Sequence, residues 1–151
     1  MLRVVVAAFH LLALGLGLGA VLTRGNALRE PLTPQSLQRA FSADTLWGIA
    51  AFLWVLTGLW RLLKLEKGTE YYFANHFFLA KMALFLVILV LEVWPMVMLI
   101  RWRSALRKGQ SLADFAPPGV AKRIATISHV EALLVVLMVF AAAAMARGYG
   151  L

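Results

Sequence analysis

The sequence predicts an all-α fold, an integral membrane four-helix bundle. Of its 151 residues, 62% are hydrophobic and 15% are charged, whereas soluble domains carry roughly a quarter charged residues. The mean hydropathy is +0.82. A chain this short has too little interior to hide so much apolar surface from water. Four apolar stretches are each long enough to cross a hydrocarbon core of about 30 Å.

The four stretches form one predicted transmembrane domain over residues 1–151. Their spans are about 2–23, 43–63, 73–101 and 124–146. The first follows Arg3 and is interpreted as a retained helix, because no clear signal-peptide cleavage site follows it. The second is predicted to begin outside the membrane, with Thr33 as N-cap and Pro34 at the first helical position.

The third predicted helix is unusually long. It is capped by Thr69, continues to Lys108 and ends at Gly109. Pro95 lies inside it and should kink it. The fourth helix follows the Pro117-Pro118-Gly119 sequence and stops at Gly148.

The net charge of +8 is assigned to the membrane surface and not to nucleic acid. We place 14 of the 15 Lys and Arg residues, Arg24 included, in loops or at helix ends, where they meet lipid headgroups. No basic face is interleaved with stacking aromatic residues. The chain has no cysteine, which excludes disulfides, iron–sulfur clusters and thiolate zinc sites.

The basic residues also predict an orientation. We call the end that holds both termini side A and the opposite end side B. Side A has Arg3, Arg61, Lys64, Lys67 and Arg147; side B has Arg24, Arg29, Arg39, Arg101, Arg103, Arg107, Lys108, Lys122 and Arg123. The excess on side B predicts that it is cytoplasmic, in a multi-pass protein of the bacterial inner membrane with periplasmic termini.

Small residues predict close helix packing on the first helix. Gly15 and Gly19 form a G-x-x-x-G pair, and Ala13 and Gly17 form a second small pair one strip over. Such strips let helix backbones approach closely in lipid. The lipid bilayer is the expected partner, and a homo-oligomer through Gly15 and Gly19 is an alternative use of the strip.

Several ionisable residues fall inside the predicted spans, among them His10, Lys81, Glu92, His129 and Glu131. Such groups usually face the bundle interior and mark a pathway or a cofactor. At 1.5 Å per residue, His10 and Lys81 both lie roughly 12 Å from side A. Glu92 and His129 share a level near side B. The sequence therefore predicts two polar layers.

The side A layer predicts a haem site. Trp47, Trp54 and Arg61 recur every seven residues and share a helix face. A neutral imidazole inside a helical bundle is a natural axial ligand for haem iron. His10 would be that metal ligand, and Arg61 or Lys81 would meet the propionates. In the alternative, His10 only forms a hydrogen bond across helices and Lys81 extends to the surface.

The second axial ligand is not assigned by the sequence. Met82 is near the level of His10, but the sequence does not fix the direction in which its side chain points. In the side B layer, Glu92 and His129 form either a proton-relay pair or a pair that neutralises its own charge. Glu131 points roughly 200° away from His129 on its helix, so the two cannot share one small site.

The first helix resembles that of HemJ-type protoporphyrinogen oxidases. The segment Ala7-Ala8-Phe9-His10-Leu11-Leu12 carries the resemblance, together with Arg39 before Gly48 and with Lys81 early in the third helix. These four-helix bacterial proteins are similar in architecture to CopD-like membrane proteins. As a whole, this chain most resembles an uncharacterised family of four-helix membrane proteins related to both. The resemblance implies haem b at His10.

This sequence also departs from the oxidase pattern. Leu79 stands where the oxidases have a histidine, with His76 displaced by most of a turn. Glu92 replaces another histidine, and Thr126-Ile127-Ser128-His129 replaces their Asn-Glu-x-Pro stretch. These changes weaken the implication of protoporphyrinogen oxidation more than that of haem binding.

Three functions follow from these observations. The first is a haem b protein with a redox role, which as an enzyme would be a haem-dependent membrane oxidoreductase. The second is a proton-coupled transporter that uses Lys81, Glu92 and His129. The third is a non-catalytic membrane scaffold that associates through the glycine strip of the first helix.

Overall fold

The computed structural model describes residues 1–63 and 69–150. Its helices are α1 (Leu2–Arg29), α2 (Pro34–Leu63), α3 (Thr69–Ala74), α4 (His76–Arg107), α5 (Leu112–Phe115) and α6 (Pro118–Ala146). The described residues contain no strand, and α1, α2, α4 and α6 are each long and apolar enough to cross a membrane. The predicted all-α membrane bundle is confirmed. Lys64 and Lys67 lie outside the described residues.

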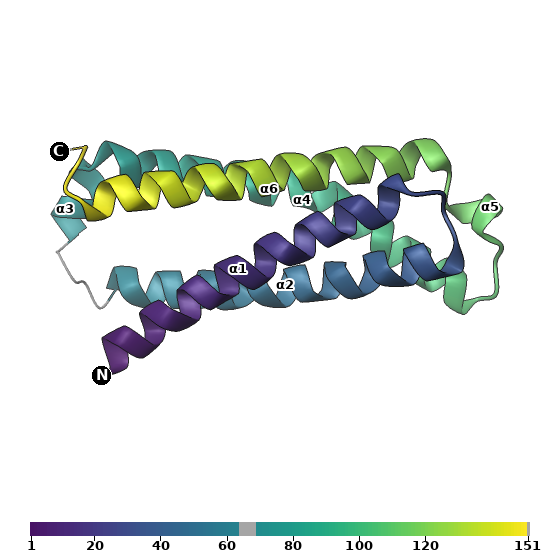
Figure 1. Ribbon diagram of the computed structural model, residues 1–151, viewed down its shortest axis with the longest axis horizontal. Coiled ribbons are helices and arrows are strands. Elements are labelled where there is room, and N and C mark those ends of the chain that lie inside the picture. Colours follow the sequence, from purple (N-terminus) through teal and green to yellow (C-terminus); the bar gives the residue numbers. More distant parts are fainter. Residues whose placement is uncertain (64–68, 151) are drawn as a thin grey trace.

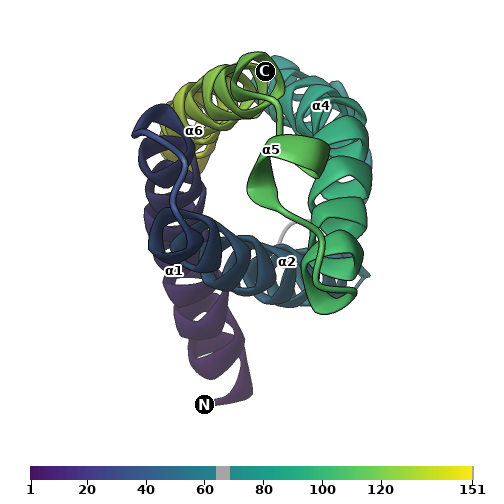
Figure 2. The same ribbon diagram turned by 90° about the vertical axis from the view of Figure 1, so that its right-hand side faces the viewer.

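The four long helices lie side by side along one axis (Figure 1). Seen end-on, they form a ring in which α1 lies between α2 and α6, and α4 lies between α6 and α2 (Figure 2). The contact between α2 and α4 is much sparser than the contacts of α1 with α2 and of α4 with α6. Both chain ends lie at side A, while α5 lies at the side B end (Figure 1).

The start of α2 agrees with the prediction. The backbone N–H of Ser36 donates to Thr33 Oγ1 at 3.0 Å, and the backbone N–H of Thr33 donates to Ser36 Oγ at 2.9 Å. This reciprocal pair satisfies two donors at the helix start in the manner of a capping box. Thr33 therefore caps α2, and Pro34 is its first helical residue.

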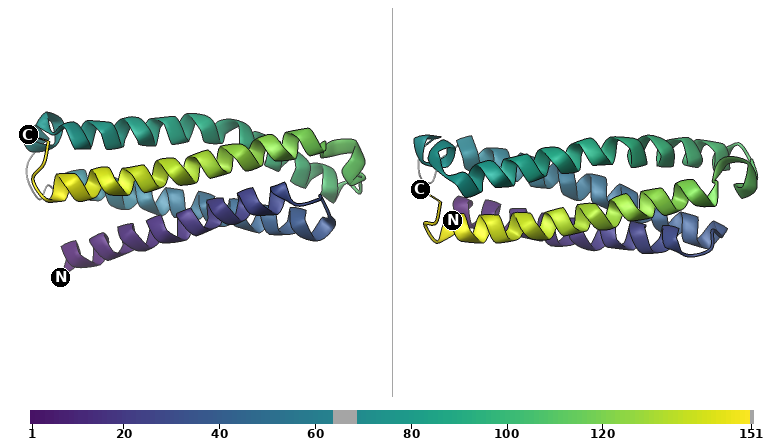
Figure 3. Two further views of the ribbon diagram at one scale, coloured as in Figure 1. Left: turned by 45° about the horizontal axis from the view of Figure 1, so that its top comes forward. Right: turned by 90° about the horizontal axis from the view of Figure 1, so that it is seen from above.

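The segment predicted as the third helix forms two helices, α3 and α4. The prediction of one continuous helix from Thr69 is therefore wrong. The Asn75 side chain accepts hydrogen bonds from the backbone N–H groups of Phe77 and Phe78, at 3.0 and 3.2 Å. An asparagine that caps in this way starts a new helix, which is α4. Pro95 lies inside α4, which bends part-way along its length (Figure 3). Gly109 ends the segment with φ +76°.

Apolar side chains divide between the interior and the outer faces. One buried cluster near side B includes Leu28, Leu37, Leu99, Trp102 and Ile124. A second, central cluster includes Val21, Trp47, Trp54, Ile88 and Val135. Many other large apolar side chains point outward from the long helices, which is the surface that lipid requires.

The two small-residue strips of α1 face different surroundings. A Cβ at Gly17 would lie 3.2 Å from the Trp47 ring, so Gly17 lets α1 approach α2 closely. Gly15 and Gly19 are exposed, and a Cβ at either would have no neighbour within 4 Å. The strip of Ala13 and Gly17 therefore serves packing within the chain. Association through Gly15 and Gly19 stays a prediction.

Bulk at Gly17 should separate α1 from α2. We expect Gly17→Leu to lower the free energy of unfolding by roughly 1–3 kcal/mol, the usual cost of overpacking. Gly15→Leu is the matched control, because its side chain would extend into lipid and leave the monomer fold unchanged. Thermal unfolding in detergent micelles measures both, and equal stability of the two variants would contradict the assigned packing.

Candidate functional site

His10 is held in a fixed orientation by α2. The Trp54 Nε1–H donates to His10 Nε2 at 2.9 Å. Nε2 is thus an acceptor, so a neutral ring carries its proton on Nδ1. Nδ1–H donates to Thr57 Oγ1 at 2.9 Å, and the Thr57 hydroxyl donates to the Leu53 carbonyl at 2.7 Å. Gly58 leaves room for this imidazole, since a Cβ there would lie 3.3 Å from its Cε1 atom.

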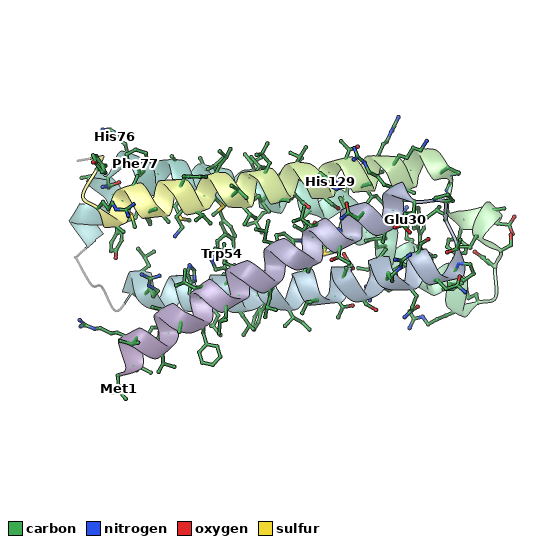
Figure 4. All side chains as sticks on the ribbon, viewed as in Figure 1. Met1, Glu30, Trp54, His76, Phe77 and His129 are labelled. Atoms are coloured by element: carbon green, nitrogen blue, oxygen red, sulfur yellow. The ribbon has the colours of Figure 1, made fainter. Side chains whose placement is uncertain are left out.

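The three predicted haem-site residues line one hollow, which we call the His10 cavity. It has a volume of about 370 Å³ and lies between α1, α2, α4 and α6 near side A. His10, Arg61, Lys81 and Tyr72 are among its polar lining residues, and Phe78 and Met138 are among its apolar walls. Figure 4 shows Trp54, another wall residue, in the interior of the bundle. The predicted side A layer is thus brought together.

The described charged residues that line the His10 cavity are cations. The described residues that line it include no carboxylate. Lys81 forms no ion pair with any described residue, although its side chain is only partly exposed. A cation held at such a position favours an anionic partner. An adjoining hollow of about 170 Å³ shares His10 and Lys81 and extends to Met82.

A second polar site lies near side B and is centred on Arg24. This side chain is fully buried, at 0% exposed. Its five N–H groups make five hydrogen bonds, with N···O distances of 2.8–2.9 Å. The acceptors are Ser128 Oγ, Asp44 Oδ1, both carboxylate oxygens of Glu92, and Glu131 Oε2. Every donor of the guanidinium is therefore satisfied.

Arg103 adds a second guanidinium to this site. Its Nη2 donates to Asp44 Oδ2 at 3.0 Å and to the Phe41 carbonyl oxygen. We call the set Arg24, Asp44, Glu92, Arg103, Ser128 and Glu131 the Arg24 cluster. Its members come from α1, α2, α4 and α6, so the cluster joins all four spanning helices. No group of the described residues has the composition of a His, Cys or carboxylate metal centre.

The placement of Arg24 corrects the sequence analysis. The sequence predicts Arg24 at a helix end among the lipid headgroups, because the first apolar stretch stops at Thr23. In the structure α1 continues to Arg29, so Arg24 lies one to two turns inside the helix. A signal was present in the sequence: Asp44, Glu92 and Glu131 fall on three other helices and need a buried cation.

Glu92 and His129 lie at one level, as predicted, but have different partners. Glu92 pairs with Arg24. His129 Nε2 instead lies 3.0 Å from Oδ1 of Asn26, which follows Arg24 by two residues in α1. His129 Nδ1–H donates to the Ala125 carbonyl at 2.6 Å. Figure 4 shows His129 beside the C-terminal part of α1. Among the described residues, no hydrogen bond or ion pair joins the two members of the predicted relay.

Loss of Arg24 should strongly destabilise the protein. Arg24→Met leaves three buried or half-buried carboxyl groups without their main cation, so we expect the free energy of unfolding to fall by about 3–5 kcal/mol. Arg29→Met changes an exposed arginine of the same helix and should have no measurable effect. Thermal unfolding in detergent compares them, and a stable Arg24→Met variant would show that the cluster does not hold the helices together.

Comparison with known proteins agrees with this architecture. Residues 2–150 match the family described as "Predicted membrane protein (DUF2214)". No curated protein and no solved structure matches the chain. These comparisons do not show the similarity to HemJ-type oxidases or to CopD-like membrane proteins, so a haem role stays a prediction. The chain belongs to the DUF2214 family of predicted membrane proteins.

Proposed function

We propose that this membrane protein binds haem b in the His10 cavity and has a redox role. The observation that carries the proposal is the shared cavity of His10, Arg61 and Lys81. An imidazole, two cations and apolar walls are the groups that a porphyrin with propionates requires. Bound haem would supply one-electron chemistry.

The residues of the His10 cavity fit this role if His10 Nε2 exchanges its hydrogen bond from Trp54 for the iron. Nδ1 of His10 is anchored to Thr57, which keeps the lone pair on Nε2, the nitrogen that would face iron. Trp54 at present donates to that lone pair, so the indole must release it. Met82 and Met138 line the cavity or its adjoining hollow and offer thioethers as second ligands. Lys81 would hold a propionate.

The absorption spectrum of the purified protein tests the proposal. After expression with added haem, we expect a Soret band that shifts on reduction, and its loss in His10→Ala. His129→Ala is the matched control, because this histidine lies at the other end of the bundle. A wild-type protein without a Soret band, or an unchanged spectrum in His10→Ala, would refute haem ligation by His10.

Two further variants make the same titration sharper. Trp54→Phe keeps an aromatic ring but removes the competing N–H, so haem should bind about tenfold more tightly, the equivalent of one hydrogen bond. Lys81→Met should weaken binding by about tenfold, because a charged partner of a propionate is lost. Lys122→Met, on an exposed part of α6, should change nothing. If neither Trp54→Phe nor Lys81→Met changes the affinity for haem, the haem binds outside the His10 cavity.

We also propose that side B faces the cytoplasm of a bacterium, across its inner membrane. Arg24 is buried in the Arg24 cluster and Arg103 is paired with Asp44 there, so we leave both out of the count of basic residues at side B. Seven exposed basic residues remain on side B: Arg29, Arg39, Arg101, Arg107, Lys108, Lys122 and Arg123. Five are assigned to side A by sequence, and the bias persists.

Cysteine labelling measures this orientation directly, since the natural chain contains no cysteine. We expect an impermeant maleimide, added to intact cells, to label Tyr149→Cys at side A and to leave Ser111→Cys at side B unlabelled. Both positions are exposed. Labelling of Ser111→Cys alone would reverse the orientation. Disrupted cells should label both and serve as the control.

A further inference from the structure

The Arg24 cluster contains one more carboxyl group than guanidinium group. Arg24 from α1 and Arg103 from α4 face Asp44 of α2, Glu92 of α4 and Glu131 of α6. The remaining titratable group at this level, His129, is directed to Asn26 instead. If every carboxyl group were ionised, one negative charge would stand uncompensated within the bilayer. Such a charge is expensive in lipid.

The three carboxyl groups are not equally compensated. Asp44 receives one guanidinium on each oxygen, from Arg24 and from Arg103. Both oxygens of Glu92 accept from Arg24. Glu131 accepts on Oε2 alone, from the same Nη2 that serves Glu92. Among the described residues its buried Oε1 has no hydrogen-bond partner.

Burial distinguishes Glu131 in the same way. Its side chain is 0% exposed, against 18% for Glu92 and 12% for Asp44. An ionised carboxylate with one unsatisfied oxygen in a dry interior loses solvation that nothing replaces. A carboxylic acid at that position carries no charge and leaves the cluster neutral. The geometry therefore selects Glu131 as the group that holds a proton.

We propose that the Arg24 cluster is a proton-binding site, in which Glu131 holds an exchangeable proton at neutral pH and Glu92 connects it to side B. Glu92 and Glu131 are neighbours, because Oε2 of each lies 2.8 Å from Arg24 Nη2. In uptake, Glu92 passes on a proton taken from hydronium at side B, so one O–H bond of hydronium breaks, one O–H bond forms on Glu131, and the excess charge is cancelled. Release returns the proton through the partly exposed Glu92. The site is separate from the His10 cavity, since the apolar cluster of Val21, Ile88 and Val135 lies between them, and it does not depend on haem.

Infrared spectroscopy of the full chain in nanodiscs tests the proposal. At neutral pH the wild type should show the carbonyl stretching band of a protonated carboxyl group, and this band should shift in D₂O. Glu131→Gln should lose the band. Glu30→Gln is the matched control, because Glu30 is exposed and pairs with Arg39 at the surface. No band in the wild type, or an unchanged band in Glu131→Gln, would overturn the proposal.

Thermal unfolding supplies a second measurement that does not rest on the spectrum. Glutamine is a neutral isostere of protonated glutamate, so Glu131→Gln should keep the midpoint within about 2 °C of the wild type. Glu92→Gln removes a charge from two hydrogen bonds of Arg24 and should lower the midpoint by at least about 5 °C. If Glu131→Gln fails to fold, or if its unfolding midpoint is lowered as much as that of Glu92→Gln, ionised Glu131 is required and the proposal is refuted.

A bound cation is the competing way to balance the charge. The infrared measurement is therefore repeated with and without saturating NaCl or KCl. A proton site keeps its band in both solutions. Disappearance of the band in one of the salts would assign the excess charge to a monovalent cation in place of the proton.

Discussion

The buried guanidinium of Arg24 is the interaction on which the rest of the structure depends. In a bilayer, helices gain little from apolar contact with one another, because lipid is equally apolar. Polar contacts then decide which faces meet. Arg24 reaches carboxyl or hydroxyl groups on α2, α4 and α6, and all five of its N–H groups are occupied. A slip of one helix by a turn would break several of these bonds inside lipid.

The two ends of the bundle differ in charge. Near side A, the described lining of the His10 cavity contains cations and an imidazole but no carboxylate. Near side B, carboxyl groups outnumber guanidinium groups in the Arg24 cluster. The first arrangement attracts an anion and the second retains a proton. An apolar core lies between the side chains of the two sites, so the polar groups of one site do not pair with those of the other.

Much of this fold could be predicted because it follows from two lengths. The first length is the thickness of the bilayer, which with hydropathy predicts four spanning helices. The second is the helix rise per residue, which predicts His10 and Lys81 at one level, and both residues do line the His10 cavity. Partners were harder to predict. Arg24 was assigned to the headgroups since an arginine that follows an apolar run usually lies there. Asn75 was missed as a cap because its role depends on a backbone break that hydropathy does not report.

The hydrogen bonds of His10 were also outside the reach of sequence. The seven-residue spacing placed Trp54 and Arg61 on one face, and both do line the cavity. The spacing could not show that the Trp54 indole N–H donates a hydrogen bond to His10 Nε2. That bond depends on the rotation of α1 against α2, which only tertiary contacts fix. Gly17 contributes to it by admitting the Trp47 ring.

The helix α1 connects the two sites mechanically. His10 and Arg24 are fourteen residues apart, which is nearly four turns and roughly 21 Å along the axis. Their side chains therefore lie close to the same face of α1. When the carboxyl groups of the Arg24 cluster hold Arg24 toward the interior, the same rotation turns His10 toward Trp54 and Thr57. The charged cluster near side B thus orients the imidazole near side A, although no side chain runs between them.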